Sequence, residues 1–294
     1  MGMRLPYSWQ PRYYVTTMNH QLDQTRVQRR LIRTLATYDE HAVVQKELCA
    51  RALERFDYIK HEPQHILDLS LHSRDGEAIL HQRFPKARYM AASPLLAELQ
   101  QRKRRWFKKP LSVCVPFGTL PFQTACVDFI FMNLTLLWTN DWPLLLRECR
   151  RLLKPKGMLL FTTLGPDTLI ELQEAATHPC VHSFVDMHDI GDAMIHAGFE
   201  NPVTDMEKVV LQYASLRQLV MDLKRTGCNN ARNDRANALM TPRQWQHLEK
   251  RYPSQQGVLP ATFEFVYGHA WAGEHLPQRT NEAGDVAVSL SSLR

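Results

Sequence analysis

The sequence lacks the features that mark several classes of protein. Its 12 glycines and 17 prolines in 294 residues are too few for a collagenous or low-complexity chain. It has no run of 18 apolar residues, so no membrane-spanning helix is predicted. The first 15 residues have neither an apolar segment nor a small-residue cleavage site, which argues against a secretory signal. The six cysteines include no Cys-x-x-Cys pair, which favours reduced thiols in a cytoplasmic protein.

The composition that remains is that of an ordinary globular chain. Apolar residues make up 44% of the sequence and charged residues 22%, enough to bury a sizeable core. Lys and Arg number 36 against 30 Asp and Glu, a formal net charge of +6. This mild excess favours an acidic partner but is far from a histone-like charge.

Strand and helix patterns alternate along most of the chain. Strands are predicted at 65–70, 87–92, 111–117, 127–134, 158–163, 203–213 and 262–267. Helices are predicted at 28–55, 76–84, 94–106, 142–153, 165–176, 186–197, 215–226 and 241–251. The alternation predicts an α/β fold with a parallel sheet covered on both faces. Ligands of such sheets bind at the carboxyl ends of the strands, where we look for the site.

The chain divides into three parts on the same patterns. Residues 1–30 are interpreted as an arm without steady periodicity. Residues 31–271 are interpreted as one domain, with a helical cover at about 166–200. Residues 272–294 form a polar tail.

Several strings resemble those of one family. The narrowest are Gly-Pro-Asp-Thr-Leu at 165–169, Asp-Met-His-Asp at 186–189 and Tyr-Gly-His-Ala-Trp at 267–271. Together with Tyr-Asp-Glu-His-Ala at 38–42 and Met-Asp-Leu-Lys at 221–224, they resemble the BioC family over about residues 31–294. The layout is also similar to that of a methyltransferase-like assembly factor of mitochondrial complex I. Lys224, which replaces a Gln of that second group, favours the biotin branch.

The resemblance implies a fold and a function. BioC proteins are class I methyltransferases of biotin synthesis that use S-adenosylmethionine (SAM) to esterify the free carboxyl of malonyl-acyl-carrier protein. The implied fold is a Rossmann-like, seven-stranded, mostly parallel sheet that ends in an antiparallel hairpin of 203–213 with 262–267. Helices at 28–55 and 166–197 are expected to cover its carboxyl edge. The implied partner is acyl-carrier protein, which is strongly acidic on its recognition helix.

The cofactor motif departs from the family pattern at three places. The glycine-rich turn after the first strand, which starts at Asp68, has Ser70, His72 and Arg74 at its glycine positions. The acid that ends the second strand is replaced by Ala91 or Ala92, and the acid after the third strand by Pro116. Of these three devices only Asp68 remains, and Asn133, at the end of the fourth strand, is a further position that matches a cofactor contact.

The size of these losses suggests an impaired SAM site. A hydrogen bond to a charged group contributes about 1.5–3 kcal/mol, so two lost carboxylates remove roughly 3–6 kcal/mol. That corresponds to roughly 10²–10⁴ in affinity. Two hypotheses follow: a divergent methyltransferase with a poor cofactor site, or a non-catalytic pseudoenzyme that binds the carrier protein or an active paralogue.

The resemblance and the residue types suggest further site residues. Carboxylate methylation needs little acid–base chemistry, and Tyr38 and His269 are only weak candidates for catalysis. A free malonyl carboxylate requires a cation, for which we expect Lys224, with Arg225 beside it. No metal site is expected, because Asp186, with the residues that follow it, is interpreted as a helix cap.

Two basic runs are candidates for an acidic partner. The denser one covers 101–109, and the second contains Arg147, Arg150, Arg151, Lys154 and Lys156. Each suits a solvated helix face, an acidic carrier protein or, with interleaved aromatics, nucleic acid. Carrier protein is preferred to nucleic acid because of the family resemblance.

Overall fold

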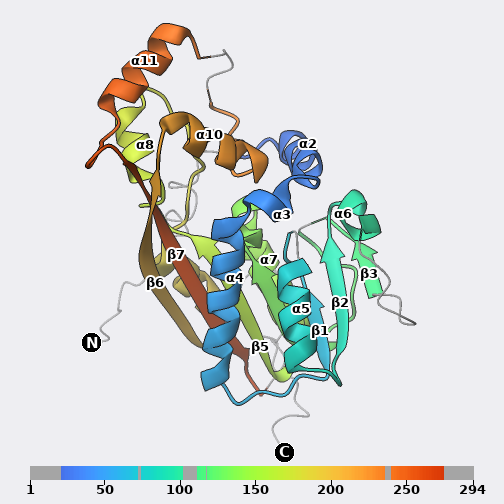
Figure 1. The fold of residues 1–294 in the computed structure, drawn as a ribbon. Coiled ribbons are helices and arrows are strands. Elements are labelled where there is room, and N and C mark those ends of the chain that lie inside the picture. The colour runs from blue at the N-terminus through green and yellow to red at the C-terminus, as the bar shows by residue number, and fades with distance from the viewer. Residues whose placement is uncertain (1–20, 72–73, 102–110, 117, 236–239, 275–294) are drawn as a thin grey trace, which may run out of the picture.

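A single seven-stranded sheet forms the centre of the protein in a computed structural model that describes residues 21–71, 74–101, 111–116, 118–235 and 240–274 (Figure 1). The strand order is β3-β2-β1-β4-β5-β7-β6. The strands are β1 (His65–Asp68), β2 (Arg88–Ser93), β3 (Leu111–Cys114), β4 (Val127–Asn133), β5 (Leu153–Leu164), β6 (Phe199–Tyr213) and β7 (Leu259–Ala272). The first five are parallel, and β7 is antiparallel to both β5 and β6. The predicted class I methyltransferase sheet is confirmed.

Two layers of helices bury the two faces of the sheet. On one face, α4 (Val43–Arg55) and α5 (Arg74–Arg83) lie in front of the strands in Figure 1. On the other face, α7 (Trp142–Leu152) and α9 (Met187–His196) share a hydrophobic cluster with Ile130 and Leu159. Short α6 (Leu96–Gln101) follows β2. The alternation of side chains along each buried strand therefore fills two cores that belong to one domain.

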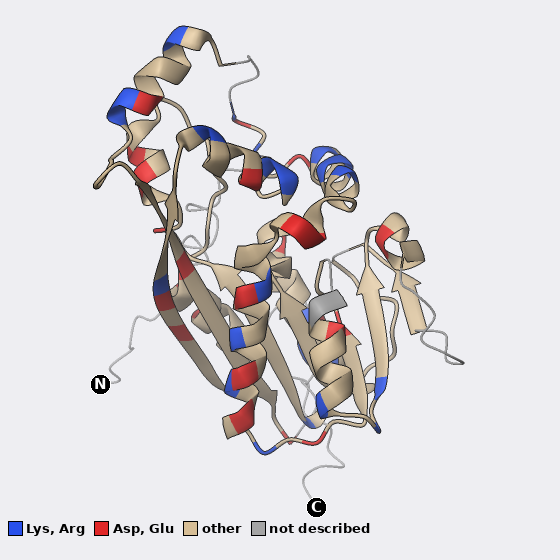
Figure 2. Cartoon of the chain, viewed as in Figure 1, with Lys and Arg blue, Asp and Glu red and all other residues tan. Residues whose placement is uncertain are grey.

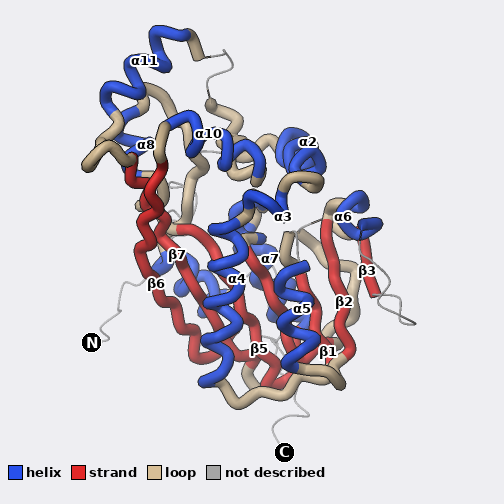
Figure 3. The backbone as a smooth tube through the Cα atoms, in the orientation of Figure 1, coloured by secondary structure: helices blue, strands red, loops and turns tan. Residues whose placement is uncertain are grey.

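A third group of helices lies beyond the carboxyl ends of the parallel strands (Figure 3). Its members are α2 (Gln24–Thr34), α3 (Tyr38–His41), α8 (Ile170–Ala175), α10 (Leu216–Arg225) and α11 (Pro242–Arg251). Helix α11 begins with a capping box between Thr241 and Gln244, and α10 with the cap of Ser215. Two 3-10 helices, Phe56–Tyr58 and Thr135–Trp138, complete the described elements.

The helix predicted at 28–55 is wrong in its extent, because the structure has three helices there. Helix α2 starts within the predicted arm, where the Asp23 carboxylate accepts a hydrogen bond from the Arg26 amide at 3.0 Å. The chain breaks after α2 and again at Ala42, whose ψ of 46° is not helical. Only α2, α3 and α8 of the segments expected at the carboxyl edge lie there, since α4 and α9 cover the faces of the sheet.

Two family strings contain glycines that allow close approach of neighbouring segments. Within the string at 165–169, the Asp167 amide donates to the Glu264 carboxylate at 2.7 Å. A Cβ at Gly165 would lie 2.3 Å from Glu264 Cδ, so this glycine is required by the close approach. Likewise, a Cβ at Gly268 would lie 2.1 Å from the Phe161 ring. The string at 165–169 therefore has a structural role against β7, and Gly268 lets β7 lie close to β5.

Candidate functional site

The β1–β2 half of the carboxyl edge is where the family pattern places SAM. Asp68 ends β1 fully buried, and its carboxylate accepts hydrogen bonds from the Ser70 amide at 2.7 Å and from the Tyr89 hydroxyl. Ser70 Oγ accepts from the Asn133 amide at 2.8 Å. The polar groups nearest the first strand therefore hydrogen-bond to one another.

The positions expected to hold SAM offer few partners. Ala91 pairs with Asp68 in the strand register, whereas Ala92 belongs to the cluster on the opposite face. Pro116 is exposed after β3 and has no backbone N–H. His72 lies outside the described residues, and Arg74 is the first residue of α5.

Apolar side chains occupy part of the same edge. Leu71, in the turn after β1, is 4% exposed and belongs to the hydrophobic cluster that contains Tyr89 and Phe131. The Tyr89 ring also lies 5.0 Å from the His81 ring. The residues present do not fit SAM in the pose that the family motif implies, because a ribose acceptor is missing and Asp68 is already engaged.

Asn133 joins the two halves of the edge. Its side-chain oxygen accepts from Thr162 Oγ1 at 2.6 Å, and its side-chain nitrogen donates to the Gln45 carbonyl at 3.2 Å. Asn133 is 6% exposed and ties β4 to β5 and α4. The predicted cofactor position thus has a structural role in this chain.

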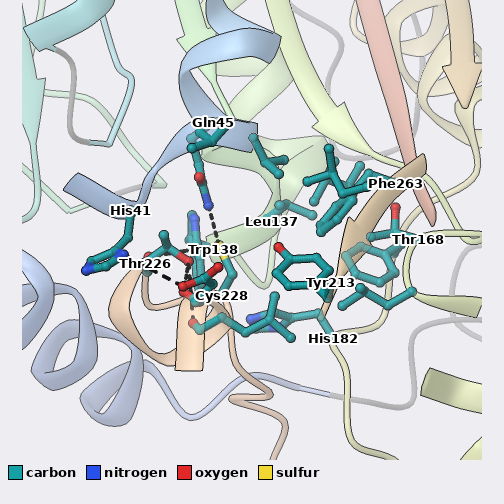
Figure 4. A pocket seen from close by; sticks show the side chains of 18 of the residues that line it. His41, Gln45, Leu137, Trp138, Thr168, His182, Tyr213, Thr226, Cys228 and Phe263 are labelled. Atoms are coloured by element: carbon teal, nitrogen blue, oxygen red, sulfur yellow. Dashed lines mark hydrogen bonds and ion pairs between the residues drawn. The ribbon is translucent and has the colours of Figure 1, made fainter. Parts of the chain in front are cut away.

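A cavity of about 240 Å³ lies beyond β4, β5 and β7, on the other half of the edge (Figure 4). Apolar and aromatic side chains form most of its wall, among them Leu137, Trp138, Phe184, Tyr213, Leu223 and Phe263. Among the described residues that line it, none is Lys or Arg. We call this space the acyl cavity.

Two buried polar side chains in the wall of the acyl cavity have atoms without partners. His182 is 5% exposed, and neither ring nitrogen has a hydrogen bond. Gln45 donates to Cys228 Sγ at 3.0 Å, but its side-chain oxygen has no partner. Such buried, unpartnered atoms are rare in protein interiors, and both residues belong to the wall of the acyl cavity.

His182 is neutral at physiological pH. Burial, and then the charges of Arg30 and Arg232, lower its pKa to about 4. The edge of its ring meets Trp138, with the ring centroids 4.8 Å apart. A neutral imidazole offers one N–H donor and one acceptor, which suits a carbonyl or an amide of a ligand.

A histidine and an aspartate from two helices approach each other in the wall of the acyl cavity. His41 Nδ1 of α3 lies 3.7 Å from Asp222 Oδ1 of α10, and both residues line the cavity. Tyr38, the first residue of α3, is buried at 5% exposure and lines neither this cavity nor the one described next. The N-terminal helices therefore meet the cover at this pair.

Lys224 and Arg225 lie away from the acyl cavity. Both are exposed at the end of α10, and the Arg225 carbonyl accepts from Thr37 Oγ1 at 3.1 Å. Lys224 instead lines a second cavity, of about 470 Å³, together with four arginines of α2. These are Arg26, Arg29, Arg30 and Arg33. We call this space the cationic cleft.

His269 lies within β7 rather than at a strand end. It pairs with Leu160, four residues before the end of β5, and lines neither cavity. Burial lowers its pKa. No contact brings it to the acyl cavity.

The Asp186 segment caps a helix. The Asp186 carboxylate accepts from the His188 amide at 2.8 Å, which starts α9. This hydrogen bond is the main cause of the lowered pKa of Asp186. Within the described parts of the chain, no group of three or more His, Cys, Asp and Glu could hold a metal.

Of the two predicted basic runs, only the second lies within the described residues. The run at 101–109 lies outside the described residues, except for Gln101 at the end of α6. In the second run, Arg150 is 2% exposed and Arg151 pairs with Glu148 at 2.7 Å. Lys154 and Lys156 also pair, with Asp128 and Glu274. Of the five cations in the second run, Arg147 is exposed and the other four are buried or paired with acids, which leaves little free charge there for an acidic partner.

Sequence reasoning missed the two cavities. Nothing in the spacing of Gln45 and His182 marks them, because the fold brings them together from distant segments. The arginines at 26, 29, 30 and 33 do have a signal, since their spacing of i, i+3, i+4 and i+7 places them on one helical face. Dividing the chain at residue 30 concealed it.

The fold and one matching family model define the class of protein. Residues 77–161 match the model of a methyltransferase domain. The structure is similar to a methyltransferase of Bacillus halodurans and to the YcgJ protein of Bacillus subtilis, each with a TM-score of 0.55. Identities are 14% and 10%, and each alignment covers 76% of this chain and 98% of the other. This is a class I methyltransferase fold.

Curated relatives identify the family within that class. A malonyl-[acyl-carrier protein] O-methyltransferase of Laribacter hongkongensis is 40% identical over 89% of this chain and 94% of its own length. Those of Halorhodospira halophila and Coxiella burnetii are 37% and 36% identical, each over 93% of this chain and 96% of theirs. The chain belongs to the family of malonyl-[acyl-carrier protein] O-methyltransferases. None of its described helices is long and apolar enough to cross a membrane.

Proposed function

We propose that this chain serves the malonyl-carrier-protein step of biotin synthesis and binds malonyl-acyl-carrier protein, with its own SAM site impaired. The named relatives support the carrier-bound substrate, since they match nearly their whole length. The cofactor part of the proposal depends on residues in which this chain departs from the family pattern.

The acyl cavity is the observation that carries the substrate part. A buried polar atom without a hydrogen-bond partner costs about 1–3 kcal/mol. His182 and Gln45, which both line the acyl cavity, have such atoms. The thioester carbonyl of a malonyl arm can accept the imidazole N–H. The apolar wall suits the rest of the arm and excludes water. A ligand in the acyl cavity would thus satisfy groups that the free protein leaves unpaired.

The impaired SAM site follows from Asp68 and its neighbours. The Asp68 carboxylate is held by Tyr89 and Ser70, and the residue beside it in the register is Ala91. SAM in the usual pose would find neither a free carboxylate for its ribose nor an acid at Pro116. We therefore expect no SAM binding at micromolar concentration.

A non-catalytic role is the second candidate. The bonded state of Asp68 favours it, because the edge is closed by the protein's own groups rather than left open for a weak ligand. Such a pseudoenzyme would bind the carrier protein or an active paralogue.

Calorimetry and an esterification assay separate these outcomes. Malonyl-acyl-carrier protein is titrated into the protein, and SAM and S-adenosylhomocysteine are titrated separately. Carrier binding without a SAM signal supports the proposal, and ester formation at millimolar SAM, detected by mass spectrometry, then assigns impaired catalysis. Absence of ester at any SAM concentration assigns the pseudoenzyme. Lack of carrier binding, or micromolar SAM binding, would overturn the proposal.

A further inference from the structure

The cationic cleft brings five Lys and Arg side chains together around one cavity. Figure 2 shows the basic positions of α2 and of the C-terminal end of α10 close together, beyond the carboxyl ends of the strands. Asp23 is the one acid among the described lining residues, and it already accepts from Arg26. The remaining cations have no acidic counterpart in the wall.

One arginine of the cationic cleft, Arg30, has a structural role. Arg30 donates to the carbonyls of Asn229 and Asn230, which fixes α2 against the segment after α10. Its pKa is lowered to about 10, mainly by burial and then by the charge of Arg26. Arg30 therefore has a structural role in the cleft, although the neighbouring positive charge of Arg26 disfavours its charged form.

Three other cations of the cleft have no ion-pair partner among the described residues. Arg29, Arg33 and Lys224 are exposed, and no ion pair joins them to any acidic group in the described parts of the chain. Val27 and Leu31 are the apolar residues that α2 buries, so Arg29, Arg33 and Lys224 are not part of the apolar packing of that helix. Like charges held together on a rigid frame repel each other, and an anionic partner relieves that repulsion.

The cationic cleft and the acyl cavity share a wall. Thr226 and Cys228 line the acyl cavity, whereas Lys224 and Asn229 line the cleft. One short segment, 224–229, therefore separates the two spaces. A protein bound over the cleft would hold an attached arm next to the acyl cavity.

We propose that the cationic cleft docks the acidic recognition helix of an acyl-carrier protein, whose acyl arm then enters the neighbouring acyl cavity. The inference rests on the proposed carrier-bound substrate and names the surface that receives it. It assigns Lys224 to the carrier protein, rather than to the malonyl carboxylate. Charges at an interface steer encounter, so their removal slows association more than it speeds dissociation.

Charge reversal on α2 tests the docking surface. The variant Arg29→Glu/Arg33→Glu is compared with Lys60→Glu/Lys86→Glu, which makes the same charge change on exposed residues outside the cleft. The association rate for malonyl-acyl-carrier protein is measured at low and high ionic strength. We expect the cleft variant to lose roughly tenfold or more in association rate and most of its salt dependence, while the control changes little.

A second variant guards against misfolding. Arg29→Gln/Arg33→Gln keeps good helix formers and should reduce association by a smaller factor with an unchanged melting temperature. Equal losses in the cleft and control variants, or no loss in the cleft variant, would overturn the docking surface and leave the proposed function intact. Tighter binding of a single-stranded oligonucleotide than of carrier protein at the cleft would also overturn it. Failure of the unmodified protein to bind carrier protein would instead reject the proposed function.

Discussion

The two halves of the sheet's carboxyl edge differ in how their polar groups are satisfied. At β1 and β2, Asp68, Ser70 and Tyr89 hydrogen-bond among themselves, and Leu71 packs beside them. Beyond β4 and β5, His182 and Gln45 keep unpaired atoms beside a cavity of about 240 Å³. Where the polar groups already hydrogen-bond to one another, a ligand adds little stabilisation. Where buried polar atoms lack partners, a ligand that bonds to them adds more.

The same contrast explains which family strings survive. The string at 165–169 binds β7, where the Leu169 backbone amide donates to the Thr262 carbonyl at 2.6 Å. It shapes the cover beside the acyl cavity and hence serves the substrate half. The lost glycines and acids all belong to the cofactor half.

Restoring the cofactor half should have the largest effect. The variant Ser70→Gly/His72→Gly/Arg74→Gly/Ala91→Asp returns the small residues and one acid. We expect it to gain on the order of 10-fold to 10²-fold in SAM affinity, since one bond to a charged group contributes about 1.5–3 kcal/mol. Calorimetry with SAM measures the gain.

A variant with Asn in place of Asp at position 91 is the control for this experiment. The same triple glycine variant with Ala91→Asn has the shape without the charge and should gain less. Micromolar SAM binding by the unmodified protein would show that the edge, closed as it is, still accepts the cofactor.

Removing one hydroxyl from the closed edge should cost stability. Tyr89→Phe withdraws a donor from the fully buried Asp68 carboxylate. We expect a loss of about 2–3 kcal/mol, or roughly 4–12 °C in melting temperature, for a bond to a buried charge. Urea and thermal unfolding measure it, and Tyr58→Phe, at 91% exposure, is the matched control. Equal stability of both variants would mean that the edge is not held by this bond.

His182, in the wall of the acyl cavity, should make the free energy of unfolding depend on pH. The pKa of His182 is about 4 in the folded protein against 6.5 for a free histidine. Above pH 6.5 both states are neutral, so its effect is absent. As the pH falls from 6.5 to 4, only the unfolded chain takes up the proton, and the free energy of unfolding drops by up to about 3 kcal/mol.

The variant His182→Phe isolates this contribution. It removes the titrating group and its unpaired nitrogens while keeping an aromatic contact with Trp138. We expect a shallower decline in stability between pH 6.5 and 4, and higher stability at neutral pH by about 1 kcal/mol, with weaker carrier-protein binding. An unchanged slope, measured by urea unfolding across that pH range, would place His182 in contact with a proton acceptor in the folded protein.

Local patterns predicted the frame better than the site. The strand positions followed from apolar runs and turn residues, which act over short stretches of chain, and the seven-stranded sheet with its antiparallel hairpin followed from the family resemblance; the strand order comes from the structure. The breaks at 35–37 and Ala42 were missed, because the apolar spacing of 28–55 continues through them. His182, Gln45 and the bond between Tyr89 and Asp68 depend on contacts between distant segments. No local pattern contains that information.

The smallest expected effect concerns the histidine–aspartate pair in the wall of the acyl cavity. His41 and Asp222 are partly exposed at 21% and 29%, and 3.7 Å separates their nearest atoms. A pair of this kind contributes about 0–1 kcal/mol, so Asp222→Asn should lower the melting temperature by no more than about 1–4 °C. Because the pair joins α3 to α10 at the cavity wall, its loss should nevertheless raise the dissociation rate of bound malonyl-acyl-carrier protein by a small factor. Arg217→Gln, on the same helix but outside both cavities, serves as the control. If both variants release the carrier protein at the unmodified rate, the pair belongs to the fold alone and the acyl cavity opens elsewhere.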